Sequence, residues 1–321
     1  MKVLLTGATG FVGSRVLHRL MDGHTHQVVA ALRHDYTGLP AGCDTTLIEG
    51  LTTSADWSVA LNGVDVVIHL AARVHVMRES ASDPLAEFRR VNVAGTLNLA
   101  QQAAAAGVRR FVYISSIGVN GNSTTWGHAF TADDTPNPHD PYSLSKYEAE
   151  MVLRQVSAET GMEVVIIRPP LIYGYGAPGN FGRLVKLVAR AVPLPLASVR
   201  NRRSLMGLDN LVDFVLTCTH HLGAANETFL VSDGDDMSTP DLVRRMASAM
   251  DLPARLFPTP SIVIMILARI IGRRSIADRL CNSLQVDISK TYTLLGWKPP
   301  FTVDEGLRRA VNKQHSREAI V

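Results

Sequence analysis

Short apolar runs alternate with longer helical patterns through the first half of the chain. Five runs share many β-branched residues and a nearly continuous hydrophobicity: KVLLT, QVVAAL, VDVVIHL, RFVYISS and EVVIIR. Such runs are typical of strands that are buried on both faces of a parallel sheet. Helical patterns lie between and after them, at about 11–22, 83–106, 142–160 and 179–190. This alternation predicts an α/β fold with a doubly wound parallel sheet.

The pattern changes after about residue 170. The stretch RPPLIYGYGAPGN is dense in proline and glycine and is therefore expected to be a loop. We predict a first domain over 1–170 and a smaller, partly interleaved lobe over 171–321, from which a segment at about 207–232 returns to the sheet. The lobe is expected to cover the carboxyl-terminal edge of the sheet, where open α/β sheets bind ligands.

Composition favours an ordinary globular protein. Of 321 residues, 46% are apolar and 19% are charged, and the net charge is +3. The basic pairs are scattered, which argues against a nucleic-acid partner. Cys43, Cys218 and Cys281 are far apart and lack metal-ligand spacing, so we expect no metal site and a reducing compartment. The chain opens on the strand-like KVLLT with no signal peptide, and a cytoplasmic location is expected.

The most apolar run, SIVIMILARII at 261–271, is too short to span a bilayer and contains Arg269. We expect no membrane insertion. A core helix or a subunit contact is favoured over a helix that lies on a membrane surface.

A glycine-rich turn, TGATGFVG, joins the first predicted strand to the first predicted helix. Gly7 permits a tight turn, Gly10 lets the backbone approach a pyrophosphate, and Gly13 lets the helix pack closely on the strand. The free N–H groups at the helix N-terminus favour phosphate. This arrangement predicts dinucleotide binding.

The second strand ends in Leu32 and Arg33, where a site that prefers NAD usually has an acid for the ribose 2′-hydroxyl. An arginine can neutralise a 2′-phosphate instead, so NADP is the expected cofactor and NAD is the alternative. The small residues of IHLAAR, at the end of a central strand, let backbone lie against the cofactor.

A serine, a tyrosine and a lysine complete the candidate site. Tyr142 and Lys146 are four residues apart and share one face of a predicted helix, and Ser116 ends a strand. A nearby ammonium is expected to lower the pKa of the phenol, so that Tyr142 exchanges a proton with a substrate oxygen while hydride moves. Ser116 would bond the same oxygen, and Lys146 would also hold the nicotinamide ribose.

Together the glycine turn, the strand-end serine and YSLSK resemble the extended short-chain dehydrogenase/reductase family, of the NAD-dependent epimerase/dehydratase type. The resemblance continues through NVAGTLNL to LGWKPPF. Within the family the chain is similar to enzymes of nucleotide-linked sugars: UDP-hexose 4-epimerases, and reductases of O-antigen synthesis that make UDP-N-acetylquinovosamine. The second likeness lies in IRPPLIYG, PLPL and NRRSLMGLDNLVDF.

The resemblance implies contact residues for both ligands. Asn180 and Arg203, with Arg279 as a weaker match, correspond to contacts of the nucleotide diphosphate, and Asn120 stands where a tyrosine is common and is expected to touch the sugar. The acid that is common after the third strand is replaced by Gly50. The cofactor is expected to contact Gly7, Gly10, Phe11, Val12, Gly13, Arg33, Leu51, Leu70, Ala71, Ala72, Tyr142, Lys146 and Pro169.

Three functions are consistent with these residues. The favoured one is an NADP-dependent reductase of the C4 keto group of a UDP-linked, N-acetylated 6-deoxyhexose. The alternative is a UDP-hexose or UDP-N-acetylhexosamine 4-epimerase with tightly bound NAD. A remote third is a non-catalytic regulator that senses NADP. The resemblance also implies a homodimer, in which helices near 92–106 and 142–160 pair.

Overall fold

Seven parallel strands form the central sheet of the computed structural model, which describes residues 1–74, 83–125, 127–272 and 274–312. The order across the sheet is β3-β2-β1-β4-β5-β6-β9. The strands are β1 (Lys2–Thr6), β2 (Gln27–Leu32), β3 (Asp44–Leu47), β4 (Val66–His69), β5 (Arg110–Ile114), β6 (Glu163–Arg168) and β9 (Thr228–Leu230). The predicted doubly wound α/β fold is confirmed.

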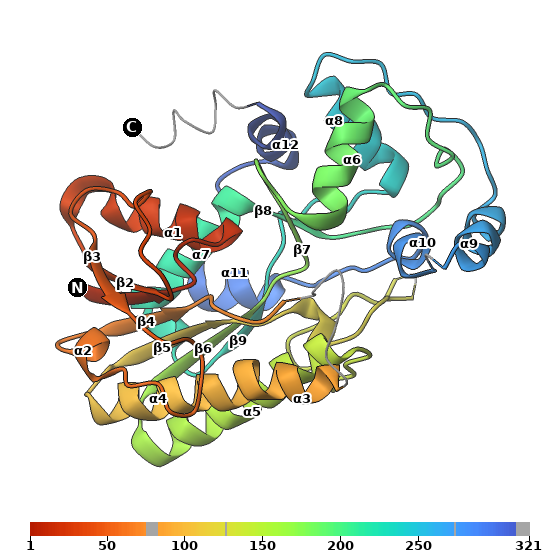
Figure 1. Cartoon of the computed structure of the whole chain (residues 1–321). Coiled ribbons are helices and arrows are strands. Elements are labelled where there is room, and N and C mark those ends of the chain that lie inside the picture. The colour runs from red at the N-terminus through yellow and green to blue at the C-terminus, as the bar shows by residue number, and fades with distance from the viewer. Residues whose placement is uncertain (75–82, 126, 273, 313–321) are drawn as a thin grey trace.

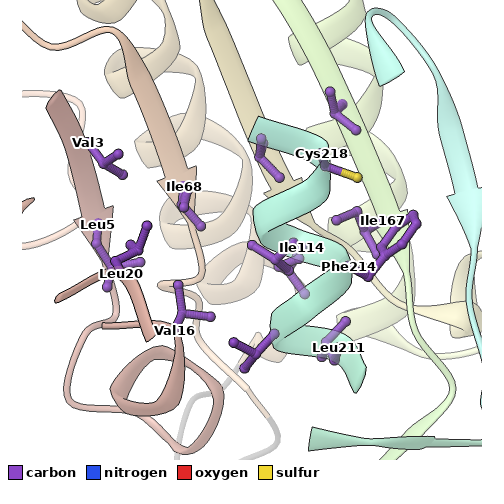
Figure 2. Packing of buried hydrophobic residues seen from close by; sticks show 14 of the residues in the cluster. Val3, Leu5, Val16, Leu20, Ile68, Ile114, Ile167, Leu211, Phe214 and Cys218 are labelled. Carbon is purple, nitrogen blue, oxygen red and sulfur yellow. The ribbon is translucent and has the colours of Figure 1, made fainter. Parts of the chain in front are cut away.

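Two long helices cover one face of the sheet. They are α1 (Phe11–Met21) and α7 (Leu208–His220), and α11 (Ser289–Leu295) lies near the β9 edge. Figure 2 shows how Phe214 and Cys218 of α7 point toward strand residues such as Ile167. All three side chains are fully buried. The segment after residue 207 therefore supplies both a helix for this face and the last strand of the sheet.

The other face is covered by α2 (Ser58–Leu61), α4 (Gly95–Ala105) and α5 (Pro141–Thr160) (Figure 1). Two short elements, α3 (Pro84–Phe88) and the π-helix η2 (Arg89–Ala94), precede α4 without a break. Leu99 of α4 and Leu153 of α5 are fully buried against the sheet. The single helix expected at 83–106 thus contains one π-helical segment.

The remaining helices build a lobe on the carboxyl-terminal side of the sheet (Figure 1). They are α6 (Gly179–Ala189), α8 (Thr239–Ser248), α9 (Ser261–Ile270), α10 (Arg274–Cys281) and α12 (Val303–Val311). Strands β7 (Leu171–Tyr173) and β8 (Leu205–Gly207) pair in parallel beside the lobe. Short helical turns lie at η1 (Asp22–His24), η3 (Ile117–Val119) and η4 (Leu222–Ala224). The division at residue 170 stays a prediction.

The stretch RPPLIYGYGAPGN was expected to be a loop, but Leu171–Tyr173 within it form strand β7. Of the two alternatives favoured for 261–271, a core helix or a subunit contact, the first is excluded. The apolar run at 261–271 is not a core helix, because Ile266 of α9 is 52% exposed and Ile270 is 75% exposed. Only a narrow inner side of α9, such as Ala268, is buried. Within the described residues, no helix is long and apolar enough to cross a membrane.

Candidate active site

The glycine turn has the conformation that its sequence requires. Gly7 has φ of +73°, and a Cβ there would lie 2.8 Å from the backbone N of Ala71. A Cβ on Gly13 would lie 2.0 Å from the carbonyl oxygen of Gly7. A side chain at Gly7 would push the turn away from the loop that follows β4, and one at Gly13 would push α1 away from the turn. The two glycines therefore permit three backbone segments to approach closely.

A buried histidine lies beneath the turn and was not predicted from the sequence. The Nδ1 atom of His69 is 2.7 Å from the Thr6 hydroxyl, and its Nε2 atom is 2.9 Å from the Thr96 hydroxyl. The Thr6 hydroxyl also accepts from the backbone N of Ala71 at 3.2 Å. Burial, with the nearby charge of Lys146, lowers the pKa of His69 to about 3. A neutral His69 therefore links β1, β4 and α4 directly under the expected cofactor.

The residues around the turn fit a dinucleotide. α1 begins at Phe11, so the N–H groups of Phe11, Val12 and Gly13 belong to its first turn and are available to phosphate. Further contacts predicted from the sequence are partly accessible beside the turn, namely Leu51, Leu70, Ala71 and Ala72. A side chain at Gly7 would clash with the backbone of Ala71, so this turn requires glycine. The glycine turn and the N-terminus of α1 thus leave backbone N–H groups available to the phosphates of a dinucleotide.

Arg33 and Pro169 occupy different surroundings. Arg33 is exposed directly after β2, and its Cδ lies 3.8 Å from the position of a Cβ on Gly50. Its side chain therefore passes over the chain that follows β3. Pro169 is buried, and its carbonyl accepts a hydrogen bond from the backbone N of Ile117 at 3.0 Å. Pro169 thus fixes the loop that follows Ser116.

Lys146 is held by the strand beside its helix. Its Nζ atom donates to the carbonyl of Ile114 at 2.8 Å and lies 4.5 Å from the centre of the Tyr113 ring. Burial lowers the pKa of Lys146 to about 7, while Glu150 opposes that change. Because α5 starts at Pro141 with Asp140 as its cap, Lys146 projects from the second turn of the helix.

Tyr142 differs from the sequence expectation in one respect. Its side chain is partly accessible in the first turn of α5 and packs edge-on against Phe88, with ring centres 6.0 Å apart. Burial, with Asp140 as a second cause, raises the pKa of Tyr142 to about 12. The expected lowering by Lys146 is therefore absent from the structure, because desolvation of the phenolate dominates.

Ser116 lies at the carboxyl end of β5, as expected. Its Oγ accepts from the backbone N of Gly118 at 3.1 Å and caps η3. A Cβ on Gly118 would lie 2.3 Å from the Oγ of Ser143 and 3.3 Å from the Oγ of Ser116. The serine loop therefore packs tightly against the first turn of α5, which carries Tyr142.

An asparagine of the π-helix joins the cofactor edge to α5. The Asn92 Oδ1 atom accepts from the backbone N of Arg73 at 2.7 Å, and its Nδ2 donates to the Ser145 hydroxyl at 3.0 Å. Ser145 in turn donates to the carbonyl of Tyr142 at 2.7 Å. π-helical segments often occur at functional sites. The NVAGTLNL stretch contains Asn92, but nothing in its periodicity indicates that the side chain points inward.

A buried ionic network supports the serine loop. Glu150 accepts from the Ser115 hydroxyl at 2.6 Å and from the Nε of Arg168 at 2.9 Å. Arg168 also donates to the Oδ1 of Asn120 at 2.9 Å, and the Nδ2 of Asn120 donates to the carbonyl of Thr131 at 2.8 Å. Asn120 is therefore bonded within the protein, and a contact with the sugar stays a prediction. The four-residue spacing of Tyr142, Lys146 and Glu150 is the sequence signal that indicates this network.

Two arginines meet where the diphosphate is expected. The Nη1 of Arg203 donates to the carbonyl of Asn282 at 2.9 Å. Burial, with the neighbouring charge of Arg279, lowers the pKa of Arg203 to about 10. Arg279 projects from α10 and is exposed, and Asn180 lies in the first turn of α6. Two neighbouring cations favour a doubly charged group such as a diphosphate.

A cavity of about 560 Å³ lies beside the glycine turn, between α1, α7 and α12. Its lining includes Gly10 and Phe11 but not Ser116, Tyr142 or Lys146. Asp209 accepts from Arg15 at 2.8 Å and from Arg309 at 3.3 Å at its wall. These ion pairs join the three helices. No group of three metal-binding side chains occurs in the part of the chain that the structure describes.

A nucleotide-binding sheet with a Ser–Tyr–Lys set defines a short-chain dehydrogenase/reductase. The family described as "NAD dependent epimerase/dehydratase family" matches residues 3–232. The chain belongs to this family, as its sequence motifs indicate.

Two curated relatives extend the comparison over nearly the whole chain. The "UDP-glucose 4-epimerase" of Vibrio cholerae is 45% identical over 310 residues, which cover 96% of this chain and 93% of the relative. The "N-acetyl-alpha-D-glucosaminyl-diphospho-ditrans,octacis-undecaprenol 4-epimerase" of Escherichia coli O157:H7 is 28% identical, with coverage of 96% and 94%.

The fold is shared with solved structures. A crystal structure of UDP-glucuronic acid 4-epimerase from Bacillus cereus in complex with NAD has a TM-score of 0.78 and 20% identity, and the match covers 99% of this chain and 97% of that one. At this level of identity the likeness concerns the fold alone.

Proposed function

We propose that the protein is a 4-epimerase of UDP-linked hexoses that uses a nicotinamide dinucleotide. The observation that carries this proposal is the 45% identity, across 96% of the chain, to the UDP-glucose 4-epimerase of Vibrio cholerae. The site adds the parts that such a reaction needs: a phenol, a buried lysine and a pair of arginines. These comparisons favour epimerisation over the reductase that the sequence alone had favoured.

Tyr142 would move the proton at the sugar C4 hydroxyl. As hydride leaves C4, the phenolate takes the hydroxyl proton and a 4-keto sugar results; return of hydride to the opposite face and of the proton to oxygen gives the epimer. The oxidised nicotinamide ring, when bound, supplies the hydride acceptor and a positive charge. A positive charge next to Tyr142 lowers the phenol pKa from about 12 toward the working range. Ser116 would donate a hydrogen bond to the same oxygen.

Lys146 would hold the ribose next to the ring. Its contact with the carbonyl of Ile114 fixes the position of the ammonium at the end of β5. Because its pKa is about 7, Lys146 is partly charged near neutral pH. This charge would favour the phenolate form of Tyr142 once the ligands are bound.

The arginine pair would hold the UDP diphosphate while the sugar turns. Arg203 is fixed by the carbonyl of Asn282, whereas Arg279 lies on the more exposed α10. A fixed diphosphate and a mobile sugar are what an epimerase needs, since both faces of C4 must reach one hydride carrier. We assign Asn180 to the same diphosphate because it lies at the N-terminus of α6.

A single incubation separates this proposal from its alternative. The purified protein is mixed with UDP-glucose or UDP-N-acetylglucosamine, without added reduced cofactor, and the C4 epimers are measured by nuclear magnetic resonance. An epimerase converts either sugar to a mixture and leaves C4 free of deuterium in heavy water, because the same hydride returns. No conversion of either sugar would contradict the proposal.

One observation keeps a 4-keto-sugar reductase as a second candidate. Arg33 directly follows β2, where an acid is common, and is exposed, which suits the 2′-phosphate of NADP. A reductase would consume NADPH in proportion to a UDP-4-keto-6-deoxy sugar. We propose NAD for the epimerase, in line with the family description and with the bound cofactor of the Bacillus cereus structure.

A further inference from the structure

One side of α9 exposes a continuous row of large apolar side chains, here called the apolar face. Three isoleucines at four-residue spacing form its centre: Ile262, Ile266 and Ile270 are 58%, 52% and 75% exposed. Val263, Leu267 and Ile271 flank them. Residues four apart lie on the same side of a helix, so these side chains form a single surface.

The opposite side of α9 attaches the helix to the lobe. Ile264 packs with the hydrophobic core of the lobe, and Ala268 is buried. α9 also packs against α10, and Figure 1 shows both helices at the edge of the molecule. The apolar face is therefore presented on a fixed helix, and a contiguous exposed patch of this kind marks an interaction site.

Two segments of the lobe that carries the apolar face are strongly basic in sequence. Residues 179–203 and 252–281 contain eleven Lys and Arg residues and one acid, Asp278, which gives a net charge of +10. The whole chain has 32 basic and 29 acidic residues, so the rest of it carries −7. The two segments lie together in the structure, where the backbone N of Leu194 donates to the carbonyl of Arg255 at 2.9 Å. We call them the basic lobe.

Arg269 places a positive charge within the apolar face itself. It is exposed and follows Ile266 by three residues, which puts the two side chains on neighbouring parts of one side. Arg255 and Phe257 are also exposed in the segment that leads to α9. Exposed isoleucines interspersed with arginines are typical of helices that lie in a membrane interface.

The arginines near the apolar face distinguish between two partners that could cover it. A second copy of the chain, placed across a two-fold axis on this face, would bring the exposed Arg255 and Arg269 of both copies together, and like charges oppose such a contact. An anionic bilayer complements the arginines and accepts the isoleucines. We propose that α9 and the basic lobe dock the protein on the surface of an anionic lipid membrane.

Docking on this side would place the substrate lobe nearest the membrane, since α10 carries both Arg279 and the contact with α9. The sequence alone favoured a core helix or a subunit contact at 261–271 over a membrane-surface helix. The exposure of α9 excludes the core helix, and its arginines favour a membrane surface over a subunit contact. The inference goes beyond the proposed function and does not depend on it.

Co-sedimentation with vesicles tests the docking. The full-length protein is mixed with vesicles of phosphatidylcholine alone or of equal parts phosphatidylglycerol and phosphatidylcholine. We expect sedimentation with the anionic vesicles only, and its loss at about 1 M salt, where the screening length falls to about 3 Å. Absence of binding to the anionic vesicles would overturn the proposal. Equal binding to both kinds would also overturn it.

Two variants assign the binding to α9. Ile266→Ser with Ile270→Ser should weaken vesicle binding more than about tenfold, because several buried carbon atoms are lost. Arg269→Gln should weaken it about fivefold, the loss expected for one basic residue at an anionic surface. The matched control is Leu222→Ser, which removes an apolar side chain that is 86% exposed on η4. It should bind as the wild type does.

Sedimentation velocity without lipid tests the second copy. If the double variant turns a dimer into a monomer and leaves vesicle binding unchanged, α9 is a subunit contact and the proposal fails. An unchanged oligomeric state with reduced vesicle binding supports it. The thermal unfolding midpoint of each variant shows that it is folded, and this readout does not require epimerase activity.

Discussion

Asn92 holds the backbone of Arg73 at both of its polar groups. Its Oδ1 accepts from the Arg73 N at 2.7 Å, and its Nδ2 donates to the Arg73 carbonyl at 3.0 Å. The same amide donates to Ser145, one turn from Tyr142. The strand-end loop beside the expected cofactor and the helix of the phenol are therefore positioned by one side chain.

Asn92→Ala should lower both stability and kcat. The partly buried Arg73 amide loses its partner, which costs about 1–3 kcal/mol in urea unfolding, and the link between this loop and α5 is lost. Asn98→Ala is the matched control, because Asn98 on α4 donates to the carbonyls of Thr52 and Ala55 at 3.0 and 2.9 Å, away from Tyr142. If both variants lose stability and neither loses kcat, Asn92 has only a structural role.

Tyr142→Phe should abolish turnover while cofactor binding persists. The ring and its contact with Phe88 remain, but the proton is lost, and proton transfer contributes about 10²–10⁴-fold to the rate. Cofactor titration and steady-state kinetics measure the two properties separately, with Tyr147→Phe on the same helix as the control. Retention of more than about a tenth of kcat would remove Tyr142 from the mechanism.

Arg203→Ala should raise KM and leave kcat nearly unchanged. A diphosphate contact is present in the ground state and in the transition state alike, so its loss weakens binding uniformly. Arg200→Ala, which removes an exposed arginine from the same segment, serves as the control. An unaltered KM for the UDP-sugar would show that Arg203 binds only the carbonyl of Asn282.

Arg33→Asp tests the reductase candidate, which requires that the wild type prefers NADPH and that the variant shifts this preference toward NADH. A charge-assisted hydrogen bond to a 2′-phosphate is worth about 1.5–3 kcal/mol, or roughly ten- to over a hundredfold in affinity. Titration of both reduced cofactors against wild type and variant measures the shift. If the wild type shows no preference for NADPH and retains NAD during purification, Arg33 is a surface residue and the reductase candidate fails.

His69 should make stability depend on pH. Its pKa is about 3 in the folded protein and about 6.5 when unfolded, so only the unfolded chain binds the proton between these values. Stability is therefore present above pH 6.5 and is lost as the pH falls, by about 1.4 kcal/mol per pH unit. His69→Gln removes this dependence, so its disadvantage relative to wild type should shrink by about 2 kcal/mol between pH 6.5 and 5. A constant difference in unfolding free energy would contradict the neutral state of His69.

The sequence predicted the parts of the site that follow from local geometry. The glycine turn requires positive φ and close approach at Gly7, and the spacing of Tyr142 and Lys146 puts them on one helix face. Strands β1, β2, β4, β5 and β6 were predicted from their β-branched runs, whereas β3 was not, because DTTL is mostly polar. These features depend on residues near each other in the chain, where periodicity and turn chemistry are informative.

Features that depend on burial could not be predicted. The pKa of Tyr142 rises because desolvation outweighs the lysine, and desolvation depends on the packing of Phe88 and α5. The link from His69 to Thr96 spans 27 residues, and no local pattern marks it. For the same reason the sequence could not distinguish a core helix from an exposed one at 261–271: hydrophobicity shows which residues avoid water, but not whether the fold covers them.

The backbone around Arg203 has a consequence for how the protein can change. Arg203 pairs in an antiparallel bridge with Met237 and in a parallel bridge with Leu284, so its position depends on three distant segments. A recombination breakpoint between residues 203 and 284 would separate this arginine from a part of its frame. In a chimera with a relative, residues 203–284 should therefore come from one parent, because both bridges of Arg203 then keep their own partners.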